Sequence, residues 1–543
     1  MTSQQWPERA NIEQLRKQAK NLLYAAKAKD PDALKRFQVL PAIARRPIGE
    51  LGVMDLALHD AQSVIAREYG LKSWNELREQ VEERSLSFAA AVDEFVRCAT
   101  GGAPARALRL LALHPSIARA NLYTELVLGA AEAVDARIRK HLEAALQPGG
   151  IQNWEPLLYV CHTCLHHDVP ERADGLVAIA RALLRQGASP NAEYHWSWHR
   201  ELPRTALWAA LCAGNHLSLA EVLLEGGANP TDGVSSHIAA ATGNLQALEL
   251  LHRFGVNVNG ITGGVPPLRY ILTWTFNADA RSAGVRWLLE HGADANLSWG
   301  EFGDAPLHVA AQKWDVPMIE SLVRHGADIH QRRKDGRTPH TLAALHGNES
   351  AAAWLLAHGA KDELSQLERF VSASALGDRA QANAMLQAHP NLRGELQREH
   401  HLMMHAPAER GDTTVLETML ASGFDANAKD NDGVTALHRA AMSGRAEAVR
   451  VLLAWGASVN ALDATFSATP LVWAAQAWSH SSYAGADHLG VARQLIAAGS
   501  TIEWIAPEKA PDPERTQEQL MELRLAAAAV DSQEDQMPCQ GTL

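Results

Sequence analysis

Residues 432–460, DGVTALHRAAMSGRAEAVRVLLAWGASVN, decide the fold. They predict two short helices, because Thr435 is a suitable N-cap for the first helix and Ser443 with Gly444 suits its end. Gly456 suits the end of the second helix, where the cap tolerates a positive φ. Apolar residues recur at helical spacing on one face of each helix. Helices of about two to three turns are not stable alone in water. Each helix therefore needs neighbours that cover its apolar face.

The same pattern recurs along the chain. A T-P-L-H-x-A-like sequence stands at 435–440 and at 305–310, and shorter versions start at Thr338 and Thr469. The starts at 305 and 338 are 33 residues apart, as are those at 402 and 435. Less regular copies start near residues 155, 205, 234, 266, 368 and 402. This motif and period resemble the ankyrin repeat over roughly residues 154–499. The resemblance implies an all-α solenoid of helix-turn-helix repeats with short β-like fingers between them.

Residues 1–85 predict a helical N-terminal cap that covers the first repeat. Asn11 is placed to start its first helix, Ser73 its last, and a third helix is expected over residues 55–69. The segments IEQLRKQAKNLL and AREYGLKSWNEL resemble a leader that precedes bacterial ankyrin arrays. The resemblance implies a bacterial protein and no particular activity.

Residues 95–115 and 370–390 match without a gap and share an L-x-x-H-P ending. Because terminal repeats are the atypical ones, we expect each copy to open an array. The alternative is one uninterrupted solenoid with two irregular internal repeats. The expected parts are the cap at 1–85, a first ankyrin array at 86–363, a second array at 364–506, and a helix with a disordered tail at 507–543.

Bulk composition excludes several classes of protein. The net charge is −12 and no basic run occurs, so nucleic acid is not an expected partner. Five cysteines in 543 residues favour a reducing compartment over a disulfide framework. No signal-peptide core, membrane span, phosphate-binding loop or dinucleotide fingerprint occurs in the sequence. We therefore expect a soluble cytoplasmic protein that contacts no membrane and carries no cofactor.

Most of the 25 histidines have a structural explanation. Four occupy the histidine slot of the repeat motif, and the resemblance implies that they form hydrogen bonds between repeats: His237, His308, His405 and His438. Three precede a glycine that ends a second helix, where a donor suits the last carbonyl groups: His291, His325 and His358. None of the seven is a candidate for a functional site.

The sequence CHTCLHH at 161–167 contains metal-ligand residue types. However, Cys161 occupies an alanine slot of its repeat, where cysteine serves as a small buried hydrophobe. Four ligands on one short helix cannot surround a tetrahedral ion, and no second such group occurs. We therefore expect no metal site.

Two unusual fingers carry the candidate binding residues. Residues 191–203 form a long insertion, and residues 299–304 form a second finger three repeats later. Fingers and first helices line the concave face of an ankyrin array, so aromatic and arginine side chains there could share one groove. The candidates are Tyr194, Trp196, Trp198, Arg200, Arg269, Trp274, Trp299 and Phe302.

Two functions follow from these fingers. The resemblance implies a scaffold that binds a protein partner in the concave groove. The alternative is a small-molecule enzyme or receptor, with His195 or His199 as general base and Glu201 or Asp304 as its orienting carboxylate. A third reading is that the aromatic side chains only pack between irregular repeats.

Overall fold

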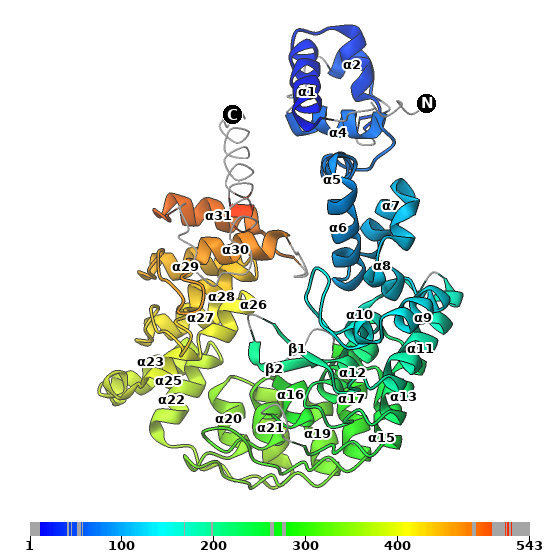
Figure 1. Cartoon of the computed structure of the whole chain (residues 1–543). Coiled ribbons are helices and arrows are strands. Elements are labelled where there is room, and N and C mark those ends of the chain that lie inside the picture. Colours follow the sequence, from blue (N-terminus) through cyan, green and yellow to red (C-terminus); the bar gives the residue numbers. More distant parts are fainter. Residues whose placement is uncertain are drawn as a thin grey trace. The chain divides into compact units, whose positions relative to one another are not determined.

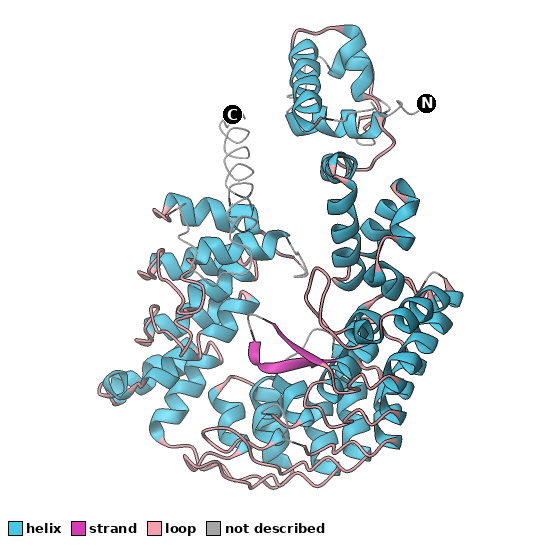
Figure 2. Cartoon of the chain, viewed as in Figure 1, coloured by secondary structure: helices cyan, strands magenta, loops and turns pink. Residues whose placement is uncertain are grey.

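The chain folds as an all-α solenoid of stacked helix pairs in a computed structural model (Figure 1). The structure describes residues 11–501 apart from 41–42, 45, 52–55, 57, 168, 197–198, 261–264, 274–277 and 480–484, together with 516, 519, 520 and 523. Within these residues, strand structure is confined to one hairpin of β1 and β2 (Figure 2). No described helix has both the length and the apolar character that a membrane span requires.

The chain forms two compact units, and the first comprises residues 1–194 and 204–229. Its helices and turns are α1 (Ile12–Lys27), α2 (Pro31–Phe37), α3 (Ile48–Leu51), α4 (Leu58–Glu68), α5 (Trp74–Ser85), α6 (Phe88–Thr100), α7 (Pro104–Leu113), η1 (Pro115–Arg119), α8 (Leu122–Val127), α9 (Ala131–Lys140), η2 (Leu142–Ala145), α10 (Pro156–His162), α11 (Pro170–Arg185), α12 (Ala206–Trp208), η3 (Ala209–Ala213) and α13 (Leu217–Glu225). The hairpin strands are β1 (Glu193–Trp196) and β2 (His199–Thr205), and residues 195–203 of this hairpin are assigned to the second unit.

The second unit comprises residues 195–203 and 230–543. Its helices are α14 (Ser235–Thr242), α15 (Leu245–Arg253), α16 (Pro267–Thr273), α17 (Ala278–Glu290), α18 (Pro306–Lys313), α19 (Val316–Arg324), α20 (Pro339–Leu345), α21 (Glu349–Ala357), α22 (Gln366–Ala375), α23 (Arg379–Ala388), α24 (Leu392–Glu395), α25 (Arg398–Leu402), α26 (His405–Arg410), α27 (Thr413–Ala421), α28 (Ala436–Met442), α29 (Ala446–Ala454), α30 (Pro470–Ser479) and α31 (His488–Ala497).

The two helices predicted within residues 432–460 are α28 and α29. Thr435 caps α28, and Ser443 is its C-cap. Gly456 follows α29 with a φ of 81°, a left-handed conformation that glycine adopts without strain. Val449 and Leu452 on α29 are fully buried. Local capping and apolar spacing therefore place this repeat as predicted.

The N-terminal cap is helical, as predicted. The Asn11 side chain caps α1, and the Ser73 hydroxyl caps α5. Leu15, Phe37 and Leu77 lie in one apolar core shared by these helices. The expected helix over residues 55–69 corresponds to α4, whose described part begins three residues later, at Leu58.

The two matching segments at 95–115 and 370–390 have the same local structure. Each contains a first helix, α6 or α22, and a second helix, α7 or α23. The second helices end at His114 and His389, whose φ and ψ are −131° and 77° and −139° and 79°. The boundary between two arrays at 363/364 stays a prediction. Arg337 joins residues on both sides of it, because its side chain lies 3.6 Å from Glu368 Oε1 and pairs with Asp335.

Histidines of the repeat motif link successive repeats at three of the four predicted positions. The Nε2 atoms of His308 and His438 lie 3.0 Å from the Gln331 carbonyl oxygen and 3.1 Å from that of Ala468. His237 makes the corresponding bond to Val265.

The fourth position differs. The Nε2 atom of His405 is buried without a hydrogen-bond partner among the described residues. In the regular repeats the histidine Nδ1 also accepts a hydrogen bond from the backbone N–H three residues earlier. Here His400 makes that bond, with the Gln397 N–H at 3.0 Å. The repeat expected to start near residue 402 therefore begins earlier, and α25 and α26 replace one regular first helix.

The three histidines before helix-ending glycines act as predicted. Nδ1 of His291, His325 and His358 bonds the carbonyl oxygen four residues earlier, at 2.7, 2.7 and 2.8 Å. Each ring thus satisfies a carbonyl group that the end of the helix would leave open.

Candidate functional site

We call the loop at residues 149–154 the first finger of the site; the insertion predicted at 191–203 is the β1–β2 hairpin. Gly149 and Trp154 form an isolated antiparallel bridge, in which the Gly149 N–H donates to the Trp154 carbonyl oxygen at 3.0 Å. The Tyr159 hydroxyl on α10 donates to the Gly149 carbonyl at 2.7 Å. Gly150 has a φ of 69°, and a Cβ atom there would lie 2.6 Å from the Tyr159 hydroxyl. The close approach of this loop to Tyr159 therefore requires glycine.

This finger brings Trp154 into an aromatic cluster, which we define as Trp154, His162, Tyr194, Trp208 and Arg204. The Trp154 ring centroid lies 4.7 Å from that of His162 and 4.3 Å from that of Tyr194. The His162 ring lies 5.8 Å from Trp208, and the Arg204 guanidinium lies over Trp208 at 4.4 Å. All these residues except His162 are partly exposed.

Residues of different elements meet in this cluster because of local sequence signals. Trp154 stands two residues before the start of α10, His162 is the last residue of that helix, and Tyr194 belongs to β1. Trp208 is the last residue of the short helix α12, and its backbone N–H donates to the hydroxyl of the N-cap Thr205 at 3.0 Å. The next five residues form the π-helical turn η3. Single π-turns are frequent at functional sites.

Two buried nitrogen atoms of the cluster have no hydrogen-bond partner among the residues that the structure describes. Burial, and then the nearby Arg204 charge, lower the pKa of His162 to about 4, so its ring is neutral at neutral pH. Burial raises the pKa of Tyr194 to about 12. His162 Nε2 and Trp208 Nε1 are both buried without a hydrogen-bond partner among the described residues. A buried polar atom left unpaired costs about 1 to 3 kcal/mol, so this site gains from an added partner or water.

The second finger, Trp299–Asp304, lies in the second unit. Its two ends form an antiparallel bridge, as in the first finger. Arg269 on α16 reaches the Asp304 carboxylate at 3.4 Å, and Arg333 of the next finger reaches it at 3.0 Å. The Arg333 guanidinium also lies 4.7 Å from the centre of the Phe302 ring. These contacts hold a turn whose Phe302 side chain is 38 % exposed.

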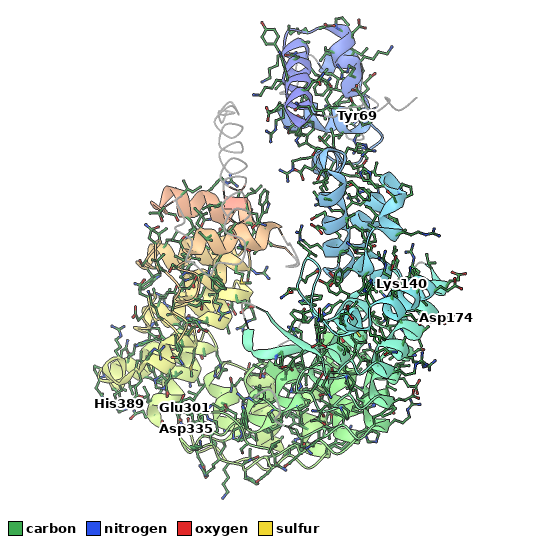
Figure 3. All side chains as sticks on the ribbon, viewed as in Figure 1. Tyr69, Lys140, Asp174, Glu301, Asp335 and His389 are labelled. Carbon is green, nitrogen blue, oxygen red and sulfur yellow. The ribbon has the colours of Figure 1, made fainter. Side chains whose placement is uncertain are left out.

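Residues 333–337 form the next finger, which has its own ion pairs and a further hydrogen bond to the second finger. Asp335 pairs with both Arg333 and Arg337, and Arg337 reaches Glu399 at 2.6 Å. The Lys334 ammonium donates to the Glu301 carbonyl oxygen at 2.9 Å. Figure 3 shows Glu301 and Asp335 close together on these adjacent fingers. The arginines hold the pKa of the Asp335 carboxyl below its usual value against the opposing effect of burial. The fingers thus form an ion-paired edge.

The structure brings the predicted site residues together in two places. Tyr194 lies in the aromatic cluster, and Arg269, Trp299, Phe302 and Asp304 lie at the second finger. The side chains of five predicted residues lie outside the described residues, as do Trp198 and Trp274 entirely. The five are His195, Trp196, His199, Arg200 and Glu201.

Sequence reasoning missed Trp154, His162, Arg204, Trp208 and Arg333 as site residues. The sequence does contain a pattern that could have indicated Trp154. The loops at 149–154 and 299–304 each precede a proline that begins the first helix of a repeat, α10 or α18. Trp154 stands two residues before Pro156, as Asp304 stands two residues before Pro306. Both positions close the bridge of their finger. Arg333 could not be found in this way, since it follows an ordinary repeat end.

The residues of the CHTCLHH segment at 161–167 have different structural roles. Cys161 is buried, as its alanine slot predicts. His162 belongs to the aromatic cluster, and the His167 Nε2 atom lies 2.9 Å from the Gly214 carbonyl oxygen. The His166 ring packs against His216 at 4.7 Å. No group of three or more potential ligands within the described part of the chain could hold a metal ion.

Comparison with known proteins identifies the repeats. A family model described as ankyrin repeats (3 copies) matches residues 276–365 and 377–503. Human SH3 and multiple ankyrin repeat domains protein 2 is 33% identical over 171 residues, which are 31% of this chain and 9% of that protein. Mouse 2-5A-dependent ribonuclease is 46% identical over 61 residues, 11% of this chain and 8% of that protein.

Two further matches are one curated relative and one solved structure. Zebrafish ankyrin repeat and SOCS box protein 11 is 32% identical over 143 residues, 26% of this chain and 45% of that protein. The crystal structure of the human ASB11 ankyrin repeat domain is 26% identical, covers 46% of this chain and all of that domain, and has a TM-score of 0.33. This chain spans less than half the length of each of these curated relatives. Residues 276–365 and 377–503 of this chain therefore match ankyrin repeats, and they lie within the all-α solenoid.

Proposed function

We propose that this protein is a scaffold that binds a protein partner through its fingers, with the aromatic cluster as the main contact of the first unit. The single observation that carries this proposal is the composition of that cluster. Trp, Tyr and Arg are the residues that dominate the binding energy of protein interfaces, and here Trp154, Tyr194 and Arg204 are partly exposed together.

The buried nitrogen atoms of the cluster that are unpaired within the described part of the chain also favour binding of a partner over simple packing. Two buried nitrogen atoms, on His162 and Trp208, lack partners among the described residues. The Trp208 Nε1–H is a donor and His162 Nε2 can accept, so both atoms could pair with a partner if binding shifts these rings toward the surface. The ring contacts hold the side chains in place, so little conformational entropy is lost on binding.

The second finger is proposed as a secondary contact of the same kind. Phe302 is exposed above Arg333, and the ion pairs around Asp304 make this turn rigid. The same ion pairs weigh against a catalytic role for Asp304. A carboxylate already shared by two guanidinium groups is poorly placed to orient a histidine base.

The cellular setting is proposed from the same residues. Cys98, Cys161, Cys164 and Cys212 are free thiols, which suits the reducing cytoplasm. A bacterial origin rests on the leader resemblance within residues 1–85, whereas the relatives described above are animal proteins. Ankyrin-repeat relatives in general support binding to proteins.

The experiment compares affinity capture by wild-type protein with capture by two tryptophan variants. Trp154→Ala removes the centre of the aromatic cluster. Trp455→Ala removes an unrelated tryptophan that is 48 % exposed at the end of α29. A specific partner should be recovered equally by wild type and Trp455→Ala, and at least about tenfold less by Trp154→Ala, equivalent to about 1.4 kcal/mol.

A folding control separates binding from packing. Circular dichroism should show the same helix content in all three proteins, with melting within a few degrees of wild type. Arg204→Ala provides a second binding test that removes no ring from the cluster. Retention of the partner by both Trp154→Ala and Arg204→Ala would refute the proposed surface. Strong destabilisation by Trp154→Ala with no binding loss in Arg204→Ala would assign the cluster to packing.

A further inference from the structure

A cavity of about 180 Å³ lies in the second unit, where the irregular repeat interrupts regular stacking. Its walls come from α18, α20, α22, α26 and α27 and from the turn before α26. The replacement of one regular first helix by α25 and α26 leaves this space beside α22. Helix α22 packs against both α20 and α27, and α26 packs against α27; Figure 1 shows α20 beside α22 and α26 close to α27.

The cavity is apolar at its base and polar at its mouth. Leu345, Pro407 and Met419 are buried at the base. Lys313 and Arg410 are exposed side chains of its lining. A ligand that fits must therefore combine an apolar part with a polar head.

The charge of the lining is one-sided. Its ionisable residues are Lys313, Arg410 and His346, and no aspartate or glutamate belongs to it. This is notable in a chain with a net charge of −12. Within the described residues, Arg410 forms no ion pair. The Lys313 ammonium donates to the Thr273 carbonyl oxygen at 2.8 Å. The mouth therefore attracts an anion.

His346 lies between the base and the mouth. Burial, followed by the charges of Arg333, Arg337 and Arg410, lowers its pKa to about 4. The ring is therefore neutral at neutral pH and can donate one hydrogen bond and accept another. Its side chain has no hydrogen-bond partner within the described residues. His346 adds no charge at neutral pH, so the charged side chains of the lining are those of Lys313 and Arg410, which are both basic.

Cavity size limits the apolar part. An apolar cavity of about 150 Å³ accepts benzene, so a cavity of this size holds a group about as large as a leucine or phenyl side chain. The Arg410 guanidinium is planar and matches a carboxylate with two parallel hydrogen bonds.

We propose that this pocket binds a carboxylate that carries one small apolar group. A free acid of this size and the C-terminal residue of a polypeptide present the same chemistry. This site is separate from the aromatic cluster, and its proposal does not depend on the proposed function.

The test is calorimetric titration of the full chain with N-acetyl-leucine and N-acetyl-leucinamide. The acid should bind at least about tenfold more tightly than the amide, because only the acid pairs with Arg410. N-acetylglycine should bind more weakly than N-acetyl-leucine, because it leaves the apolar base empty. A leucine-terminated hexapeptide, with and without a C-terminal amide, distinguishes a polypeptide end from a free acid as the source.

Three variants assign the binding to this pocket. Arg410→Gln should weaken binding of the acid about tenfold and leave the amide unchanged. Ala406→Phe places a ring at the exposed mouth and should abolish binding. Arg450→Gln, an exposed arginine on α29, is the matched control and should bind as wild type. Equal affinity for acid and amide, absence of binding to every acid, or unchanged binding in both pocket variants would overturn the proposal.

Discussion

Asp304→Asn tests whether this carboxylate is a structural ion-pair centre. The side chains of Asp304 and Arg333 are 13% and 9% exposed, so the pair is largely removed from water. Asparagine has the same shape but no charge. Arg269 would retain its long contacts with backbone carbonyl groups, at 3.4 Å, and Arg333 would retain Asp335.

The expected cost follows from these remaining contacts. Removal of one member of a buried pair costs about 3 to 5 kcal/mol when the other charge is left alone. Here Arg333 keeps a second acid, so we expect about 2 to 3 kcal/mol of lost stability. Glu301→Gln is the matched control in the same finger, because the Glu301 side chain is exposed and its bond to Lys334 uses the backbone carbonyl. It should change stability by less than about 0.5 kcal/mol.

The assay must resolve local stability, because repeat arrays unfold in parts and a single unfolding free energy is poorly defined. Hydrogen exchange with mass spectrometry provides this resolution. Peptides that cover α18 and the second finger should exchange about 30- to 150-fold faster in Asp304→Asn, which corresponds to the expected 2 to 3 kcal/mol. Peptides of α29 should be unchanged. Equal protection of the second finger in wild type and Asp304→Asn would refute the structural assignment and reopen a functional role for this carboxylate.

Three further outcomes are expected. The pKa values of the buried rings of His162 and His166 are about 4, below the ordinary value, so the folded state should lose stability as the pH is lowered from about 6.5 towards 4. Each ring should contribute up to about 1.4 kcal/mol per pH unit. His162→Phe should flatten this dependence in pH-controlled urea titrations, and an unchanged slope would contradict it. Limited proteolysis should cut near residues 361–366 if two arrays are separable, whereas resistance there with one shared unfolding transition would favour a single solenoid. Elemental analysis of untagged protein should find no stoichiometric zinc, and a metal lost on changing Cys161 and Cys164 to serine would contradict this expectation.

The regular repeats could be predicted from the sequence because their signals are local. Thr435 and Gly456 fix the ends of helices within a few residues of themselves, so the chain needs no distant contact to specify them. His291 likewise bonds a carbonyl group only four residues away. At His405 the predicted bond between repeats is missing among the described residues, and His400 takes the position at the start of the repeat; no local pattern marks such a change of register.

The candidate site was predictable only in part for the same reason. Tyr194 and the second finger stand out as departures from the repeat pattern, and they do lie beside aromatic and charged partners. Arg204 and Arg333 occupy ordinary positions, and only the packing of successive repeats brings them to an aromatic ring. Distances between residues of separate repeats depend on stacking geometry, which residue spacing does not encode.

Site-specific photo-crosslinking tests the proposed partner surface most directly. The photoreactive residue p-benzoyl-phenylalanine would replace Trp154 in one protein and Trp455 in the other, and each would be irradiated in a lysate of source cells. We expect one protein adduct at position 154 that excess unlabelled wild-type chain suppresses, and no such adduct at position 455. Absence of an adduct at 154, or the same adducts at both positions, would contradict partner binding at the aromatic cluster.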